Sequence, residues 1–115
     1  MVKESDIQRS ILDWLNANGY FCLRVPLGGV AQSIGNKVIY KRNPMRGFPD
    51  ILGLMKQQPG FMFVIEVKTP KGVLSKEQKA MREQLENRGV VYILARCLAD
   101  VIEELYKYDR PHHVH

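Results

Sequence analysis

One stretch decides the fold of this chain: residues 48–68, which read FPDILGLMKQQPGFMFVIEVK. It contains two apolar runs, Asp50–Met55 and Phe61–Lys68, and between them lies a turn that ends in Pro59-Gly60. Apolar runs of this length on either side of a turn are typical of adjacent antiparallel strands. The sequence therefore predicts a β-hairpin at the centre of the fold.

The same two runs carry charged residues at their ends. Asp50 opens the first run, and Glu66 and Lys68 close the second. Burying such groups is costly unless something binds them. Side chains two apart on a strand share a face, so Glu66 and Lys68 should project together while Ile65 and Val67 point into the core. Because the turn reverses the chain, we expect Asp50 beside them at one edge of the sheet.

Two carboxylates, together with a backbone carbonyl and waters, form a site of hard oxygen ligands that suits Mg²⁺ or Mn²⁺ better than zinc. A metal ion there would polarise a phosphate and acidify a bound water. The ammonium group of Lys68 can orient that water and offset the negative charge of the transition state, as phosphodiester hydrolysis requires. The alternative is an ordinary salt-bridge network of Asp50, Glu66 and Lys68. The apolar setting of both runs favours the nuclease interpretation.

The rest of the chain predicts further helices and strands around this hairpin. Apolar periodicity and caps predict three helices: one capped by Ser5 or Asp6 and ending at Asn18-Gly19, one from Ser75 to about Gly89 with Ala80 or Met81 and Leu85 in the core, and one over Leu98–Tyr108. Strands are expected over Tyr20–Val25, Lys37–Lys41 and Val90–Ala95. Turn residues predict an irregular polar stretch over Gly28–Asn36 and a loop over Asn43–Pro49. The strand, helix, strand order from Phe61 to Ala95 predicts a parallel pair. The fold class is therefore α/β, a small mixed β-sheet flanked by helices. We expect one domain over residues 1–115 with a flexible tail, 109–115.

Composition narrows the setting. The 115 residues are 45% apolar, enough to bury one core. Seventeen Lys and Arg against twelve Asp and Glu give a net charge of +5, which suits a polyanionic partner, although it can also simply aid solubility. Cys22 and Cys97 have no paired spacing and are predicted to be reduced, buried and structural. Because no signal peptide or membrane-spanning stretch is visible, we expect a soluble, cytoplasmic protein.

The charged pattern also resembles a known superfamily. Pro49-Asp50, fifteen further residues and then Glu66-Val67-Lys68 resemble the PD-(D/E)XK phosphodiesterases, which have a restriction-endonuclease-like core. Other segments make the chain similar to the stand-alone VRR-NUC (virus-type replication-repair nuclease) domain: Glu4 with Ile7-Gln8, Arg46–Gly53, Ile65–Lys68, Gly72–Gln78 and Gly89–Tyr92. This ordered combination is more specific than the general motif.

The resemblance implies a role for each matching residue. Asp50 and Glu66 would bind the divalent metal together with the carbonyl of Val67, and Lys68 would assist the attacking water. Glu4 and Gln78 would border the same site. For these two, another interpretation stays open: Gln78 can be the capping-box partner of a helix, and Glu4 can favour a positive helix start.

The resemblance also implies a substrate and an assembly. Minimal viral and phage members of the family resemble structure-selective endonucleases, some of which cut four-way (Holliday) junctions as homodimers. Branched DNA and a homodimer are therefore expected, in the host cell cytoplasm if the chain is viral. Arg46 and Lys71 flank the motif and are predicted to contact the DNA backbone. For Lys41 and Lys76, solvated surface charge is the preferred interpretation.

Three alternatives remain at this point. The chain can be a nuclease that acts on flaps or other DNA without a junction preference, or a catalytically silent nucleic-acid-binding subunit with the same fold. The intact Asp50, Glu66 and Lys68 set argues against the silent subunit. A sequence-specific restriction-type enzyme would need an added recognition region, which this length scarcely accommodates.

Overall fold

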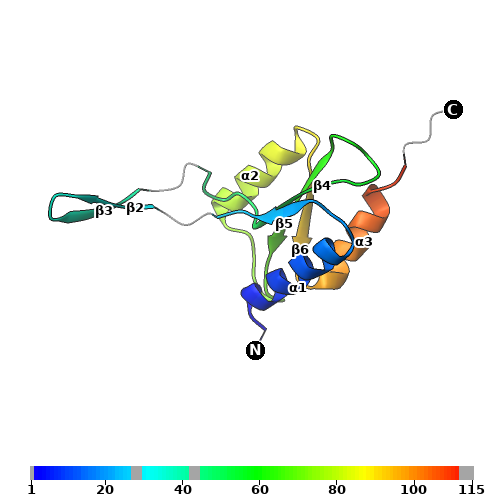
Figure 1. Cartoon of the computed structure of the whole chain (residues 1–115), viewed down its shortest axis with the longest axis horizontal. Coiled ribbons are helices and arrows are strands. Elements are labelled where there is room, and N and C mark those ends of the chain that lie inside the picture. The colour runs from blue at the N-terminus through cyan, green and yellow to red at the C-terminus, as the bar shows by residue number, and fades with distance from the viewer. Residues whose placement is uncertain (1, 27–29, 42–44, 112–115) are drawn as a thin grey trace.

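The structure is a computed structural model that describes residues 2–26, 30–41 and 45–111 (Figure 1). For residues 30–34 and 39–41 it describes the backbone alone. Along the described residues, one helix is followed by five strands and then by a helix, a strand and a helix. In order they are α1 (Glu4–Ala17), β1 (Cys22–Arg24), β2 (Val30–Ile34), β3 (Lys37–Lys41), β4 (Ile51–Leu54), β5 (Met62–Val67), α2 (Lys76–Glu86), β6 (Val91–Ala95) and α3 (Leu98–Tyr108). Among these helices, none has the length and apolar character needed to cross a membrane.

Four strands form the central sheet, in the order β1-β4-β5-β6. Strands β4 and β5 are the predicted antiparallel hairpin, in which Ile51 pairs with Ile65 and Leu54 pairs with Met62. Strand β1 is antiparallel to β4, and β6 is parallel to β5. The predictions of a mixed sheet flanked by helices and of a parallel β5–β6 pair are therefore confirmed.

Helices α1 and α3 cover one side of this sheet, which we call the apolar face. Both helices are amphipathic, and their buried positions follow the spacing of successive turns. The core is formed by the buried residues Ile7, Ile11 and Leu15 of α1, Val101 and Leu105 of α3, and Ile51, Met55, Phe63, Ile65, Val67, Ile93 and Ala95 of the sheet region. Burying each large side chain contributes about 1.5–3 kcal/mol.

Helix α2 lies against the other side of the sheet, which we call the polar face because it carries Glu66 and Tyr92. The Arg82 guanidinium of α2 stacks on the Tyr92 ring, 4.8 Å from its centroid. Helix α2 has no fully buried residue, so its predicted core face is only partly correct: Met81 and Leu85 are half-buried and Ala80 is exposed. Helix α2 therefore covers the sheet without contributing a fully buried side chain.

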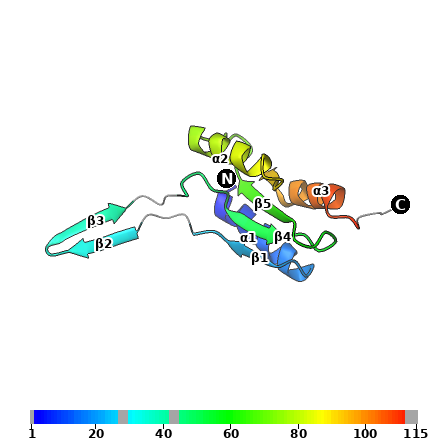
Figure 2. The same cartoon turned by 90° about the horizontal axis from the view of Figure 1, so that it is seen from above.

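Strands β2 and β3 form a separate hairpin that projects from the rest of the protein in both views (Figures 1 and 2). The strand at Lys37–Lys41 was predicted, but Val30–Ile34 was expected to be irregular, and that prediction is wrong. The two runs are separated by a two-residue Gly35-Asn36 turn with Ile34 paired to Lys37, and Gly35 adopts a φ of +62°. Glycine favours such a φ, so this turn lets the two runs pair. Gly28 and Gly29, the first residues of that predicted irregular stretch, lie outside the described residues.

Three smaller predictions need correction. Helix α1 begins at Glu4 with Lys3 as its N-cap, because the Lys3 carbonyl accepts the N–H groups of Asp6 and Ile7. Neither cysteine is buried: Cys22 is half-buried and Cys97 is exposed, although both are free thiols. Cys97 is exposed because it sits at the start of α3 rather than within a strand.

The residue that opens the predicted flexible tail is anchored. The Asp109 carboxylate accepts hydrogen bonds from the Tyr20 hydroxyl at 2.8 Å and from the backbone N–H groups of Lys56 and Gln57 at 3.1 and 2.7 Å. These contacts hold the end of α3 against the β4–β5 turn. The tail histidines at 112, 113 and 115 lie outside the described residues.

Candidate active site

Asp50 lies immediately before β4, where two neighbouring strands hold it. Its backbone carbonyl accepts the N–H of Val25 at 2.8 Å, and its carboxylate Oδ2 accepts the N–H of Val67 at 2.8 Å. Pro49, just before it, is fully buried. A carboxylate that accepts a backbone N–H at this distance makes a strong, charge-assisted bond. The Asp50 side chain is therefore fixed at the end of β5, as the hairpin reversal predicts.

Glu66 occupies the polar face near the end of β5. It is only 2% exposed, and its Oε1 atom is buried without a hydrogen-bond partner among the described residues. Burial first, and then the hydrogen bond and negative charge of Asp50, raise the pKa of Glu66 to about 9. Lys68 lowers that pKa, and Glu4 raises it further. Asp50, Lys68 and Glu4 therefore all lie close enough to Glu66 to act on its carboxyl group.

Lys68 is held at the point where β5 ends. Its backbone N–H donates to the Ala95 carbonyl at 3.0 Å, and its side chain is half-buried. A methyl group added to Gly72 would lie 3.4 Å from Cβ and Cδ of Lys68, so the turn that follows packs against the lysine stem. The structure thus brings together Asp50, Glu66 and Lys68 as the sequence predicted.

Glu4 and Gln78 each lie in the first turn of a helix, α1 and α2. Glu4 lies in the first turn of α1 and influences the pKa of Glu66 through its charge. Gln78 completes a capping box: its side-chain carbonyl accepts the Ser75 N–H at 2.8 Å, and its own N–H donates to Ser75 Oγ at 3.1 Å. The cap leaves the amide NH₂ of Gln78 without a partner among the described residues. A cap and a contact at the site are therefore compatible roles for Gln78.

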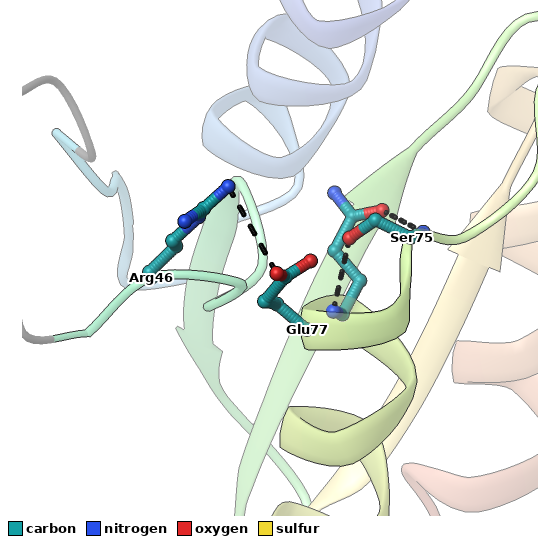
Figure 3. Close-up of polar contacts among 4 residues, drawn as sticks. Arg46, Ser75 and Glu77 are labelled. Carbon is teal, nitrogen blue, oxygen red and sulfur yellow. Dashed lines mark hydrogen bonds and ion pairs between the residues drawn. The ribbon is translucent and has the colours of Figure 1, made fainter.

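The loop before Asp50 is fitted against the start of α2 (Figure 3). Gly47 has a φ of +87°, and a methyl group there would lie 2.6 Å from the Glu77 carbonyl oxygen, so only glycine fits. Arg46 points toward Glu77 and forms an ion pair with it at 3.9 Å, with about half of each side chain exposed. Arg46 also contributes to lowering the pKa of Glu77, after a backbone hydrogen bond. The predicted DNA contact is thus, in this structure, a bridge between the motif loop and α2.

Two comparisons relate this chain to known proteins. A model of the VRR-NUC domain family matches residues 2–98 of the chain. The chain belongs to the VRR-NUC family. A solved structure titled "VRR_NUC domain" superposes with a TM-score of 0.63 at 19% identity, covering 94% of this chain and 99% of the other. At that identity the likeness shows the fold alone. No curated protein matches.

Membership of the VRR-NUC family makes the chain a nuclease-type domain of the PD-(D/E)XK fold. The matched residues run from the start of the chain to the first residue of α3 and include the whole site. The family model therefore covers α1, the central sheet and α2.

The side chains of this VRR-NUC site suit a hard divalent cation. Within the described part of the chain, no three His, Cys, Asp or Glu side chains gather in one place, so the side-chain ligands available are Asp50 and Glu66. Mg²⁺ is commonly bound through one or two carboxylates, with waters and substrate phosphates completing its coordination. The buried, unpartnered Oε1 of Glu66 is an oxygen that such a cation would satisfy. The residues present therefore fit Mg²⁺ or Mn²⁺.

Sequence reasoning missed Arg96, which holds the turn after Lys68. Its Nη1 donates to the carbonyls of Thr69 at 2.6 Å and Gly72 at 2.7 Å, with a longer contact to Pro70 at 3.2 Å. Lys71 lies in this same turn and is exposed. The signal for Arg96 in the sequence is its position. It is a cation that directly follows the buried strand β6, which runs parallel to β5.

Proposed function

We propose that this VRR-NUC chain is a divalent-metal-dependent endodeoxyribonuclease that hydrolyses phosphodiester bonds in branched DNA such as four-way junctions. One observation carries the catalytic part: Asp50 and Glu66 meet at the end of β5, and the buried Glu66 Oε1 has no partner among the described residues. An ordinary surface salt-bridge network would expose its carboxylates to water. A 2% exposed glutamate beside an aspartate is instead a site that needs a cation.

Each residue then has a physical task. Asp50 and Glu66, with the Val67 carbonyl, would hold Mg²⁺ or Mn²⁺, which supplies Lewis-acid polarisation of the phosphate and a lowered pKa for the attacking water. The Val67 N–H keeps the Asp50 carboxylate in place through its hydrogen bond. Glu66 binds a cation only as a carboxylate, so loading the site releases its proton. The Lys68 ammonium offsets the negative charge that develops on the phosphate.

Contacts with DNA are assigned to the cations on the loops around the site. Lys71 is exposed in the turn that follows Lys68. The Arg46–Glu77 pair is half-exposed, and such pairs are worth only about 0.2–1 kcal/mol, so a phosphate can readily replace Glu77. The net charge of +5 supports a polyanionic partner of this kind. Backbone contacts alone read DNA shape rather than sequence.

The preference for junctions and the homodimer follow from the family resemblance. Two copies related by a two-fold axis would present two sites to a branched substrate, so that two strands can be cut symmetrically. The natural setting for this reaction is inside the cell, in the host cytoplasm if the chain is viral.

The test is cleavage of a labelled four-way junction, a flap and a linear duplex, each with Mg²⁺, Mn²⁺ or EDTA. We expect cleavage that needs the metal, prefers the junction and falls at least about 100-fold in Asp50→Ala and Lys68→Ala. Asp13→Ala removes an exposed carboxylate on α1 and serves as the matched control with normal cleavage. Cleavage in EDTA, or at full rate in Asp50→Ala, would contradict the metal mechanism. Cleavage of the flap and the duplex at the same rate as the junction would contradict the junction preference. A monomer by sedimentation would contradict the homodimer.

A further inference from the structure

Two side chains share an unusual property: each has a buried polar atom with no hydrogen-bond partner within the described residues. They are Glu66, through Oε1, and Tyr92, through its hydroxyl. Glu66 already has a proposed task, but Tyr92 does not. Nearly all buried polar groups in folded proteins are paired, so an unpaired pair of neighbours needs an explanation.

The sheet places these two residues side by side. Strand β6 runs parallel to β5, with Tyr92 paired to Val64 and Leu94 paired to Glu66. Tyr92 and Glu66 are therefore diagonal neighbours on the polar face, within reach of a long aromatic side chain. Tyr92 is 6% exposed, and its ring lies under the Arg82 guanidinium of α2. The ring is thus buried and covered by Arg82 on the side of α2.

Electrostatics agree with this placement. Burial raises the pKa of the Tyr92 hydroxyl, and the negative charge of Glu66 is the next largest cause, with Asp50 also contributing. The hydroxyl consequently stays protonated and is a hydrogen-bond donor at neutral pH. Glu66 Oε1 is an acceptor that lacks a donor. A carboxylate oxygen has two lone pairs, so Glu66 Oε1 can accept a hydrogen bond from this donor and still bind a cation.

Energetics show that the hydroxyl is not there for stability. A buried hydroxyl without a partner loses its hydration and gains no hydrogen bond in return, so it is less favourable than a paired one. Phenylalanine would fill the same space and keep the ring beneath Arg82 without that cost. A tyrosine at this position is therefore best explained by what its hydroxyl does at the site.

We propose that Tyr92 is a positioning residue of the metal site, whose hydroxyl donates a hydrogen bond to Glu66 Oε1 through one bridging water and so fixes the orientation of that carboxylate. The inference rests on the proposed function, since it concerns the same carboxylate. Partners that orient a ligating carboxylate commonly contribute 10- to 100-fold to metal affinity.

The experiment measures Mn²⁺ binding to the DNA-free protein by electron paramagnetic resonance, together with thermal unfolding in EDTA. In Tyr92→Phe we expect the Mn²⁺ dissociation constant to rise about 10- to 100-fold, with an unfolding temperature equal to or above that of wild type. Tyr20→Phe is the matched control, because the Tyr20 hydroxyl bonds Asp109 away from the site. This control should lower the unfolding temperature and leave Mn²⁺ affinity unchanged.

The outcomes separate the two proposals. Wild-type affinity in Tyr92→Phe, with weakened binding in Asp50→Ala, would overturn the role of Tyr92 and leave the metal mechanism standing. A Tyr92→Phe protein that loses its fold would also overturn it, because the hydroxyl would then be structural. Wild-type protein that binds no Mn²⁺ would contradict the proposed function itself.

Discussion

The two faces of the central sheet differ in composition and in what covers them. The apolar face packs against α1 and α3 through an apolar cluster that is almost completely buried. The polar face carries Glu66 and Tyr92, each with a buried oxygen that has no partner in the described part of the chain, beneath a helix that has no fully buried residue. Toward β1 and β4 this face is more open, and Leu23 and Leu54 are 44% and 41% exposed.

The difference separates the face that stabilises the fold from the face that carries the candidate site. Adjacent residues of β5 take part in both, because successive side chains of a strand point to opposite sides. Ile65 and Val67 are buried in the core, while Glu66 between them belongs to the site. A rigid apolar face lets the polar face hold costly groups in fixed positions.

The largest effect should come from removing a side chain on the apolar face. Ile65→Ala leaves a cavity beneath α1 and should lower the free energy of unfolding by about 2–5 kcal/mol. Leu54→Ala, on the open part of the polar face, should cost less than about 1 kcal/mol. Urea denaturation in EDTA measures both. Equal losses in the two variants would show that the faces do not divide stability in this way.

A smaller effect tests the contact that links the motif loop to α2. Gly47→Ala and Gly60→Ala both force alanine into a left-handed φ, +87° and +84°, which costs roughly 1–2 kcal/mol. Only Gly47 also faces a backbone, the Glu77 carbonyl, whereas Gly60 has open space around it.

Gly47→Ala should therefore lose more stability than Gly60→Ala, and it should also lower DNA cleavage because the loop positions Asp50. Urea denaturation and junction cleavage check the two parts. Similar behaviour of the two variants would show that the close approach to Glu77 is unimportant.

The last effect on stability concerns Glu66 and has the opposite sign. In metal-free protein the folded state keeps a proton on Glu66 up to about pH 9, whereas the unfolded chain releases it near the ordinary value of 4.5. Stability should therefore fall as pH rises between these values.

Glu66→Gln has no such proton to lose, so it should be more stable than wild type at neutral and mildly alkaline pH, while cleavage is lost. Urea denaturation at several pH values in EDTA measures this, with Glu83→Gln on the exposed surface of α2 as the matched control. Wild type and Glu66→Gln with parallel stability profiles would contradict the raised pKa.

Local patterns in the sequence predicted most of the elements. The turn at Pro59-Gly60 set the antiparallel pairing of β4 and β5, and the capping box at Ser75 set the start of α2. The strand at Val30–Ile34 was missed because its polar residues hid it, although Gly35-Asn36 is a recognisable hairpin turn. The burial of the two cysteines was predicted wrongly because it depends on distant elements.

By itself, the sequence determined which residues form the site, because hairpin reversal and strand alternation are local rules that place Asp50, Glu66 and Lys68 at one sheet edge. Only the tertiary structure decided how those residues are held. The burial of Glu66, the Gly47 contact with Glu77 and the place of Tyr92 beside Glu66 join segments far apart in the chain. Such contacts follow from how α2 and β6 pack against β5, and packing between distant segments leaves no periodic signal in the sequence.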